Sequence, residues 1–228
     1  MNESAIVPSD EPVVYLLDAD ARVLQALKRL LADAGLTAVP STTGAAFFES
    51  FQPDRVGCLV LDLALGDADG LAIQQEICDR GLTLPVVFLS GCGTVPASVR
   101  AMKAGALDFL TKPVDFFALL IAVRAGIALD LVRRAEATEK HHVLGKYETL
   151  STREKELLPY LVSGLLNKQI AGELGVVDKT VKVHRAHVMA KLGCQSRSDL
   201  VRLAERLQVN PVPRAVHCCP GKSIAITA

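Results

Sequence analysis

Residues 13–35 read VVYLLDADARVLQALKRLLADAG, and this stretch decides the fold of the first half of the chain. Its first five residues form a continuous apolar run with the length of a buried strand. Apolar residues then recur at helical spacing over residues 22–34, and Gly35 ends the pattern. The stretch therefore predicts a strand that is followed directly by a helix.

The same unit recurs along the chain. Short apolar runs return at 37–39, 58–61, 86–89 and 107–110, and they precede helical patterns at 45–51, 71–79, 95–104 and 115–132. Right-handed crossovers leave few arrangements for strands that alternate with helices. We therefore expect an α/β fold, a doubly wound five-stranded parallel sheet that is flavodoxin-like, with helices on both faces.

Charge divides the chain into two parts. The 228 residues have a net charge of zero, but residues 1–123 hold 15 acidic and 8 basic residues, whereas residues 148–208 hold 7 and 10. This asymmetry indicates two domains with different partners. We expect the first domain over 12–126, a polar helical linker over 127–147, an all-α domain of four helices over 148–208, and a disordered tail over 209–228 with several prolines and no periodicity.

Membrane and secretion signals are missing from the sequence. The first residues lack a basic segment followed by an apolar core, and the longest apolar run, 116–123, is far shorter than the roughly 20 residues of a membrane span. The six cysteines show no C-x-x-C spacing and sit mostly in apolar segments, as reduced core thiols do. We expect a cytoplasmic protein without a membrane partner, and we set aside the tail tract His217-Cys218-Cys219 as a metal site.

Four polar side chains stand at the ends of the predicted strands, namely Asp18, Asp62, Ser90 and Lys112. The carboxyl ends of parallel strands meet at one edge, where ligands bind. Neighbouring carboxylates favour a hard divalent cation such as Mg²⁺, while a lysine and a hydroxyl can contact an anion. The set predicts a phosphoryl-transfer site with an aspartate as nucleophile. Helix capping is the alternative, but it gives no reason for a lysine followed by Pro113.

Four motifs carry a family resemblance: LLDAD at 16–20, LDLALGDADG at 61–70, FLSG at 88–91 and AMKAGALDFLTKP at 101–113. In order and spacing they resemble the receiver domain of two-component response regulators. The resemblance implies that a sensor histidine kinase phosphorylates Asp62, that Asp18 and the Ala64 carbonyl help to bind Mg²⁺, and that Lys112 pairs with the phosphate. It further implies that Ser90 and Phe109 move as a switch, and that the peptide bond before Pro113 is cis.

One departure concerns the metal. The resembling family has two adjacent acids after the first strand, whereas this chain has Asp18-Ala19. We expect weak Mg²⁺ binding and slow phosphorylation unless Asp20 substitutes as a ligand. Two alternatives stay open: a regulator whose receiver works without phosphorylation, and a phosphatase of the haloacid dehalogenase type built on Asp18-x-Asp20. The latter leaves Asp62 and the second domain unexplained, so we do not expect an enzyme.

The second domain reads as helices joined by tight turns. Ser151-x-x-Glu154 is a capping box, and Pro159 predicts a kink or break near 155–158 because an interior proline costs about 3 kcal/mol. Asn167 and Asp178 are expected to cap the next two helices. The second of these helices runs over 179–192. Ala171 and Gly175 precede it at the spacing of a helix-turn-helix.

The helix over 179–192 has two faces. Val181, Val188 and Leu192 define its core side, and the opposite face holds Lys179, Lys182, Val183, Ala186, His187 and Ala190. Two cations and small side chains suit a helix that enters the major groove, although a solvated surface face is the plain alternative. His184 lies at the edge, where we expect packing or a phosphate contact rather than a metal.

Residues 150–154 (LSTRE), 167–171 (NKQIA) and 179–184 (KTVKVH) resemble the LuxR-type helix-turn-helix. With the receiver, the chain resembles FixJ/NarL-class response regulators over about residues 12–207. That resemblance implies promoter DNA, a homodimer on activation and RNA polymerase as partners. It implies that Lys182 and Val183 approach base edges, and that phosphate contacts come from Lys168, Thr180 and Arg185. Lys179 and His187 are also expected to take part in DNA binding. A fourth helix after Ser196 offers Leu200, Val201 and Ala204 as a dimer stripe.

Overall fold

A computed structural model describes residues 11–66, 68–91 and 95–212. It divides the chain into two units, with the boundary between Glu136 and Ala137. Among the described residues, no helix combines the length and apolar character that crossing a membrane requires.

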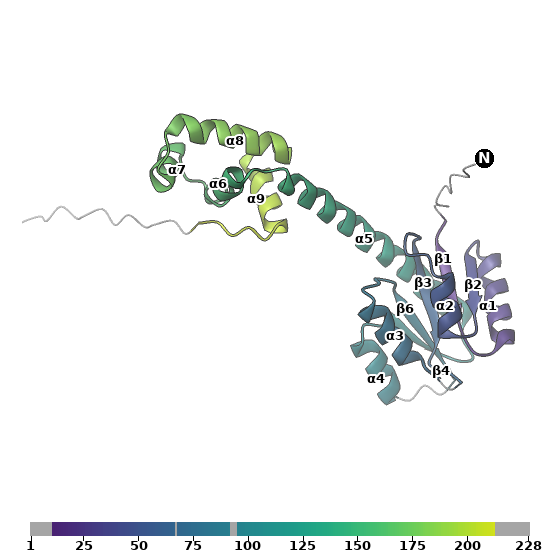
Figure 1. The fold of residues 1–228 in the computed structure, drawn as a ribbon. Helices are drawn as coiled ribbons and strands as arrows, with labels where there is room; N and C mark the ends of the chain where they lie inside the picture. The colour runs from purple at the N-terminus through teal and green to yellow at the C-terminus, as the bar shows by residue number, and fades with distance from the viewer. Residues whose placement is uncertain (1–10, 67, 92–94, 213–228) are drawn as a thin grey trace, which may run out of the picture. The chain divides into compact units, whose positions relative to one another are not determined.

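The first unit contains the predicted five-stranded parallel sheet (Figure 1). Its strands are ordered β2 (Thr37–Ser41), β1 (Val13–Leu17), β3 (Gly57–Asp62), β6 (Val86–Ser90) and β7 (Asp108–Thr111). Each neighbouring pair is parallel. The predicted fold class is therefore confirmed, with strand ends that shift by one or two residues.

Helices cover both faces of the sheet because successive strand residues point to opposite sides. Tyr15 and its alternate neighbours on β1 pack in one core with Phe47 and Ile77. That core lies under α2 (Gly44–Ser50), α3 (Gly70–Asp79) and α4 (Val95–Lys103). Leu16 packs in a second core with Leu119, under α1 (Ala21–Asp33) and α5 (Phe116–Glu148). Burial on both sides explains why the strands are apolar runs without alternation.

The loop after β3 forms a small hairpin that the sequence did not predict. β4 (Ala64–Leu65) pairs antiparallel with β5 (Ala68–Asp69). Gly66 lies in the turn with a φ of 66°, a conformation that glycine adopts without strain. The hairpin strands thus begin two residues after Asp62.

Helix α5 includes the predicted linker over 127–147. It runs without a break from Phe116 to Glu148, so the residues predicted as a helical linker are helical. Val143 is buried, and Glu139 forms an ion pair of 2.7 Å with Arg206 in the second unit. Val143 is thus a buried apolar residue in a stretch that was predicted to be polar.

The second unit adds four helices to the end of α5. They are α6 (Thr152–Ser163), α7 (Asn167–Leu174), α8 (Asp178–Leu192) and α9 (Arg197–Arg206), and they surround one apolar core (Figure 1). Of the kink or break predicted near 155–158, the break is wrong, since α6 continues through Pro159. Burial of leucine and valine side chains on α6 at about 1.5–3 kcal/mol each outweighs the proline penalty of about 3 kcal/mol.

Two capping boxes are present where the sequence has Ser151 and Ser196 at the N-caps. Asn167 and Asp178 are instead the first helical residues, after N-caps without a side-chain cap at Leu166 and Val177, so those two assignments were wrong by one position.

The tail prediction needs a correction at its beginning. Val209 packs against the core of the second unit, and the Val212 amide donates to the Pro159 carbonyl over 3.4 Å. A structureless tail from residue 209 is therefore wrong for these first residues. The remaining tail, with the tract 217–219, lies outside the described residues.

Candidate functional site

Parallel pairing brings the predicted strand-end residues together. Asp18 follows β1, Asp62 ends β3, Ser90 ends β6 and Lys112 follows β7. Asp18, Asp62 and Ser90 are 3%, 9% and 3% exposed. Three polar groups therefore lie in a largely buried cluster, where unpaired charge would be costly.

Lys112 forms ion pairs with the carboxylates of both Asp18 and Asp62. Its Nζ lies 2.5 Å from an oxygen of Asp18 and 3.0 Å from an oxygen of Asp62. Burial lowers the pKa of the Lys112 ammonium, but the hydrogen bonds to the two carboxylates outweigh burial, so the pKa is raised. The lysine also donates its amide to the Ser90 carbonyl over 2.8 Å, and its bond to Pro113 is cis. The cluster is thus an assembled pair of carboxylates around one cation.

The oxygen atoms at this site fit Mg²⁺, although Ala19 stands where the family has a second acid. One oxygen of Asp18 accepts from the Asp20 amide over 2.9 Å, and one of Asp62 faces the Ala64 amide over 3.4 Å. Two carboxylates and a nearby backbone carbonyl are hard oxygen ligands, and Mg²⁺ keeps several waters besides. Ala19 is exposed and supplies no ligand.

Asp20, the acid named as a possible substitute ligand, caps α1. Its carboxylate accepts from the Arg22 amide over 2.8 Å, caps α1, and pairs with the Arg22 guanidinium over 3.0 Å. Hydrogen bonds from Arg22 hold the pKa of this carboxyl below its usual value. In this structure the Asp20 side chain caps α1, and its substitution as a metal ligand stays a prediction.

The two switch residues predicted by resemblance flank the cluster. Ser90 pairs in register with Thr111, and Phe109 pairs with Phe88 on the neighbouring strand. The Phe109 ring is partly buried, and its centroid lies 6.2 Å from that of Phe88. Phe109 thus occupies the edge of the core within two strand positions of Ser90.

Helix α8 presents the predicted polar face. Val181, Val188 and Leu192 are buried, as expected. The exposed side carries Lys179, Lys182, Val183 and His187, while Thr180 and Arg185 are half-buried, and Lys168 is exposed on α7. Arg185 contacts the Asn167 side-chain oxygen over 3.3 Å, which ties α8 to the start of α7. This face combines free cations with a small apolar patch.

The proposed dimer stripe on α9 requires a correction. Leu200 and Ala204 are 2% and 0% exposed, and Val201 is partly buried against the same core. The stripe therefore closes the core of its own unit, so Leu200 and Ala204 are not free to face a second copy. Helical periodicity could not distinguish these two uses of an apolar face.

Glu154 has a role that sequence reasoning missed. Besides closing its capping box, it accepts from Lys191 on α8 over 2.6 Å while it is 3% exposed. The Lys191 hydrogen bond, with that of the Ser151 amide, lowers the pKa of Glu154 to about 2. The ion pair links α6 to α8 across 37 residues of sequence, a separation that no local pattern signals.

An assembled strand-end aspartate site, followed by a helix-turn-helix unit with a basic exposed face, defines a DNA-binding transcriptional response regulator. Residues 14–124 match the family model of the response regulator receiver domain, and residues 148–204 match that of bacterial regulatory proteins of the luxR family. The chain belongs to the FixJ/NarL class of response regulators.

Full-length relatives agree with this assignment. The response regulator protein TodT of Pseudomonas putida is 40% identical over 196 residues, 86% of either chain. The transcriptional regulatory protein FixJ of Azorhizobium caulinodans is 38% identical over 209 residues, 92% of this chain and 99% of that one. The structure of response regulator StyR matches with a TM-score of 0.78 at 38% identity, over 86% of this chain and 99% of that one.

The comparisons also bear on the phosphatase alternative. The segment that contains Asp18 and Asp20 lies within the receiver match, as does Asp62. Family membership therefore accounts for the residues that the phosphatase reading left unexplained. Regulators of this type work with sensor kinases and DNA, and receiver domains typically bind Mg²⁺ at the site of phosphorylation.

Proposed function

We propose that this regulator is phosphorylated on Asp62 by a sensor histidine kinase, with Mg²⁺, and that phosphorylation controls promoter binding through dimerisation of the receiver, which extends over 12–126. The observation that carries the proposal is the contact of Lys112 with both Asp18 and Asp62. A buried pair of acids held by one lysine at the strand ends serves no packing purpose, and it supplies a nucleophile beside a cation.

The chemistry follows from these groups. An oxygen of Asp62 attacks the phosphorus of the donor, the bond to the donor breaks, and an acyl phosphate remains on Asp62. Lys112, 3.0 Å from that carboxylate, pairs with the added negative charge. Asp18, Asp62 and the Ala64 carbonyl would hold Mg²⁺, which would neutralise charge on the transferring group.

Phosphorylation then acts as a two-state switch. Ser90 donates to the phosphoryl group, and Phe109 turns inward from the edge of the core. The surface next to them on α4 exposes Val99 and Met102, at 45% and 47%. An exposed apolar surface beside the switch suits contact with a second copy, which would bring two DNA-binding units onto two half-sites.

The face of α8 supports DNA binding in the second unit, over 148–208. Lys182 and Val183 are exposed at its centre, where they would approach base edges in the major groove. The groups expected to contact phosphates are Lys168, Thr180 and Arg185, with Lys179 and His187 alongside. RNA polymerase is the further partner of the DNA-bound dimer.

The test compares Asp62→Asn with Asp54→Asn, which changes an exposed acid of the same unit. A duplex is first selected from a random pool with the wild-type protein, and binding is then measured with and without a small acyl phosphate donor. We expect donor-stimulated binding in the wild type and in Asp54→Asn, and its loss in Asp62→Asn. Equal stimulation of Asp62→Asn would refute the switch.

Ala19 favours a second candidate, a receiver that acts without phosphorylation. Because the metal site lacks one acid and Asp20 is engaged by Arg22, Mg²⁺ binding should be weak. Ala19→Asp should then increase the rate of phosphorylation at a given Mg²⁺ concentration. If neither protein is phosphorylated, while a protein contact or small ligand still changes DNA binding, the second candidate holds. If the wild type is phosphorylated as fast as Ala19→Asp, Ala19 does not weaken the Mg²⁺ site.

A further inference from the structure

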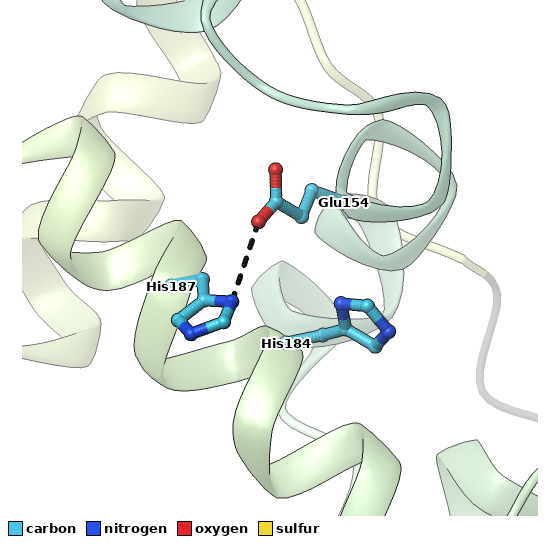
Figure 2. Close-up of side chains that lie close together, drawn as sticks. All are labelled: Glu154, His184 and His187. Atoms are coloured by element: carbon cyan, nitrogen blue, oxygen red, sulfur yellow. Dashed lines mark ion pairs between the residues drawn. The ribbon is translucent and has the colours of Figure 1, made fainter.

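Three side chains with metal-binding atoms meet between α6 and α8 in the second unit. Glu154 comes from α6, and His184 and His187 stand three positions apart on α8, so both rings lie on the same side of that helix. One ligand atom from each of the three residues lies within 4.8 Å of the other two. Figure 2 shows the two rings and the carboxylate turned toward a common space.

The hydrogen bonds of this cluster leave ligand atoms available. One oxygen of Glu154 is taken by Lys191 and the Ser151 amide, at 2.6 and 2.7 Å. The other oxygen faces the Nδ1 of His187 across 3.8 Å, too far for a hydrogen bond (Figure 2). The Glu154 carboxylate is therefore held in place by one oxygen and offers the second.

His184 supplies an independent observation. Its Nδ1 is buried and has no hydrogen-bond partner among the described residues. A buried polar atom without a partner costs about 1–3 kcal/mol, and native proteins contain few of them. A neutral imidazole nitrogen is also the commonest metal ligand in proteins. The orphaned atom thus indicates that a ligand completes this site.

We propose that Glu154, His184 and His187 bind a divalent transition ion of the Zn²⁺ type, and that this ion links α6 to α8. Two imidazole nitrogens and one carboxylate oxygen are a known ligand set for Zn²⁺, with the fourth position left to water. His187, whose side chain is 59% exposed, leaves the site open to solvent. Hard ions such as Mg²⁺ prefer sites made of oxygen alone.

The ligand atoms must move closer together to bind an ion. Bonds of about 2.0–2.2 Å in a tetrahedron place ligand atoms roughly 3.3–3.5 Å apart, which compares with 3.8 Å for the Glu154–His187 pair and with distances of up to 4.8 Å within the cluster. Rotation of the two histidine side chains can supply the difference. Lys191 orients the carboxylate from its outer side, but its charge opposes the ion, so we expect weaker binding than in a closed structural site.

Binding to the folded unit alone should stabilise it. At a Zn²⁺ concentration one hundred times the dissociation constant, the ratio of folded to unfolded molecules rises about a hundredfold. For a unit of this size, that change raises the Tm by about 10 °C or more. The inference goes beyond the proposed function, because the site does not depend on Asp62, although it shares His187 with the proposed DNA-binding face.

The experiment titrates Zn²⁺ into the full chain under reducing conditions by calorimetry, with Co²⁺ as the spectroscopic probe. Glu154→Gln keeps an acceptor for the capping box, so it removes a ligand charge without opening α6. His184→Gln and His187→Gln remove the nitrogens. His141→Gln is the matched control, since His141 is exposed on α5 and bonds to the Ala137 carbonyl. All proteins also carry Cys218→Ser and Cys219→Ser.

We expect one equivalent of Zn²⁺, a Co²⁺ spectrum of nitrogen and oxygen ligation without sulfur charge-transfer bands, and a rise in Tm. Each of the three cluster variants should lose affinity at least tenfold and lose the Tm rise, whereas His141→Gln should behave like its parent. Binding that survives all three cluster variants, or no binding at all to the parent, would overturn the proposal. Sulfur charge-transfer bands would likewise assign the ion to the remaining thiols.

Discussion

Replacement of Lys112 with methionine gives a direct test of the strand-end cluster. The variant keeps the length of the side chain but leaves Asp18 and Asp62, 3% and 9% exposed, without their shared cation. Loss of one partner from a buried ion pair costs about 3–5 kcal/mol. We therefore expect Lys112→Met to lower the free energy of unfolding of the first unit by about 3–5 kcal/mol in the presence of a chelator.

Mg²⁺ should distinguish this electrostatic loss from a packing defect. A divalent cation at Asp18 and Asp62 replaces the lost charge, and saturation at one hundred times the dissociation constant returns about 2.7 kcal/mol. Mg²⁺ should thus stabilise Lys112→Met more than the wild type. The double variant with Asp18→Asn should also recover part of the loss, since it removes one of two repelling carboxylates.

The assay is urea unfolding, followed by hydrogen exchange of the amides of β1 and β3, so that the first unit is observed separately. Lys103→Met on α4 is the control, because Lys103 is exposed and should change the free energy of unfolding by less than about 0.5 kcal/mol. The folded pKa of Lys112 is raised above its usual 10.5, so its contribution is present below that pH and is lost as the pH rises above it. A loss below about 1 kcal/mol, unchanged by Mg²⁺, would refute the reasoning.

Three further predictions concern Glu154, Pro159 and Cys58. Glu154→Gln should lower the free energy of unfolding of the second unit by about 1.5–3 kcal/mol at neutral pH. Because the folded pKa of Glu154 is about 2 against a usual 4.5, this difference from the wild type should be full above pH 4.5 and fade as the pH falls toward 2, as measured by denaturation at each pH. Pro159→Ala should raise the free energy of unfolding of the same unit by about 1–3 kcal/mol, since the restored amide can donate within α6; an unchanged urea midpoint would show that the proline ring packs as well as it disrupts. Burial, aided by Asp130, raises the pKa of the Cys58 thiol to about 12, so iodoacetamide at mildly alkaline pH should label exposed Cys78 in the native protein and Cys58 only after unfolding, and equal labelling rates by mass spectrometry would contradict this.

The difference between prediction and structure is clear in the second unit. The capping boxes at Ser151 and Ser196 and the core side of α8 follow from local spacing, because they depend on residues three or four positions apart. The apolar stripe on α9 has the same kind of spacing, yet it packs inward on its own core. Local periodicity shows that a helix has an apolar face, but it does not show what covers that face.

The sequence by itself determined the order of strands and helices, the strand-end positions of Asp18, Asp62, Ser90 and Lys112, and the basic face of α8. These features follow from side-chain period and chain order, which are local properties. Tertiary structure alone decided that the apolar stripe of α9 packs on its own core, that α6 continues through Pro159, and that Glu154 meets Lys191 and the two histidines of α8. Each of those outcomes depends on competition between partners that are brought together by folding, and a linear pattern does not contain that competition.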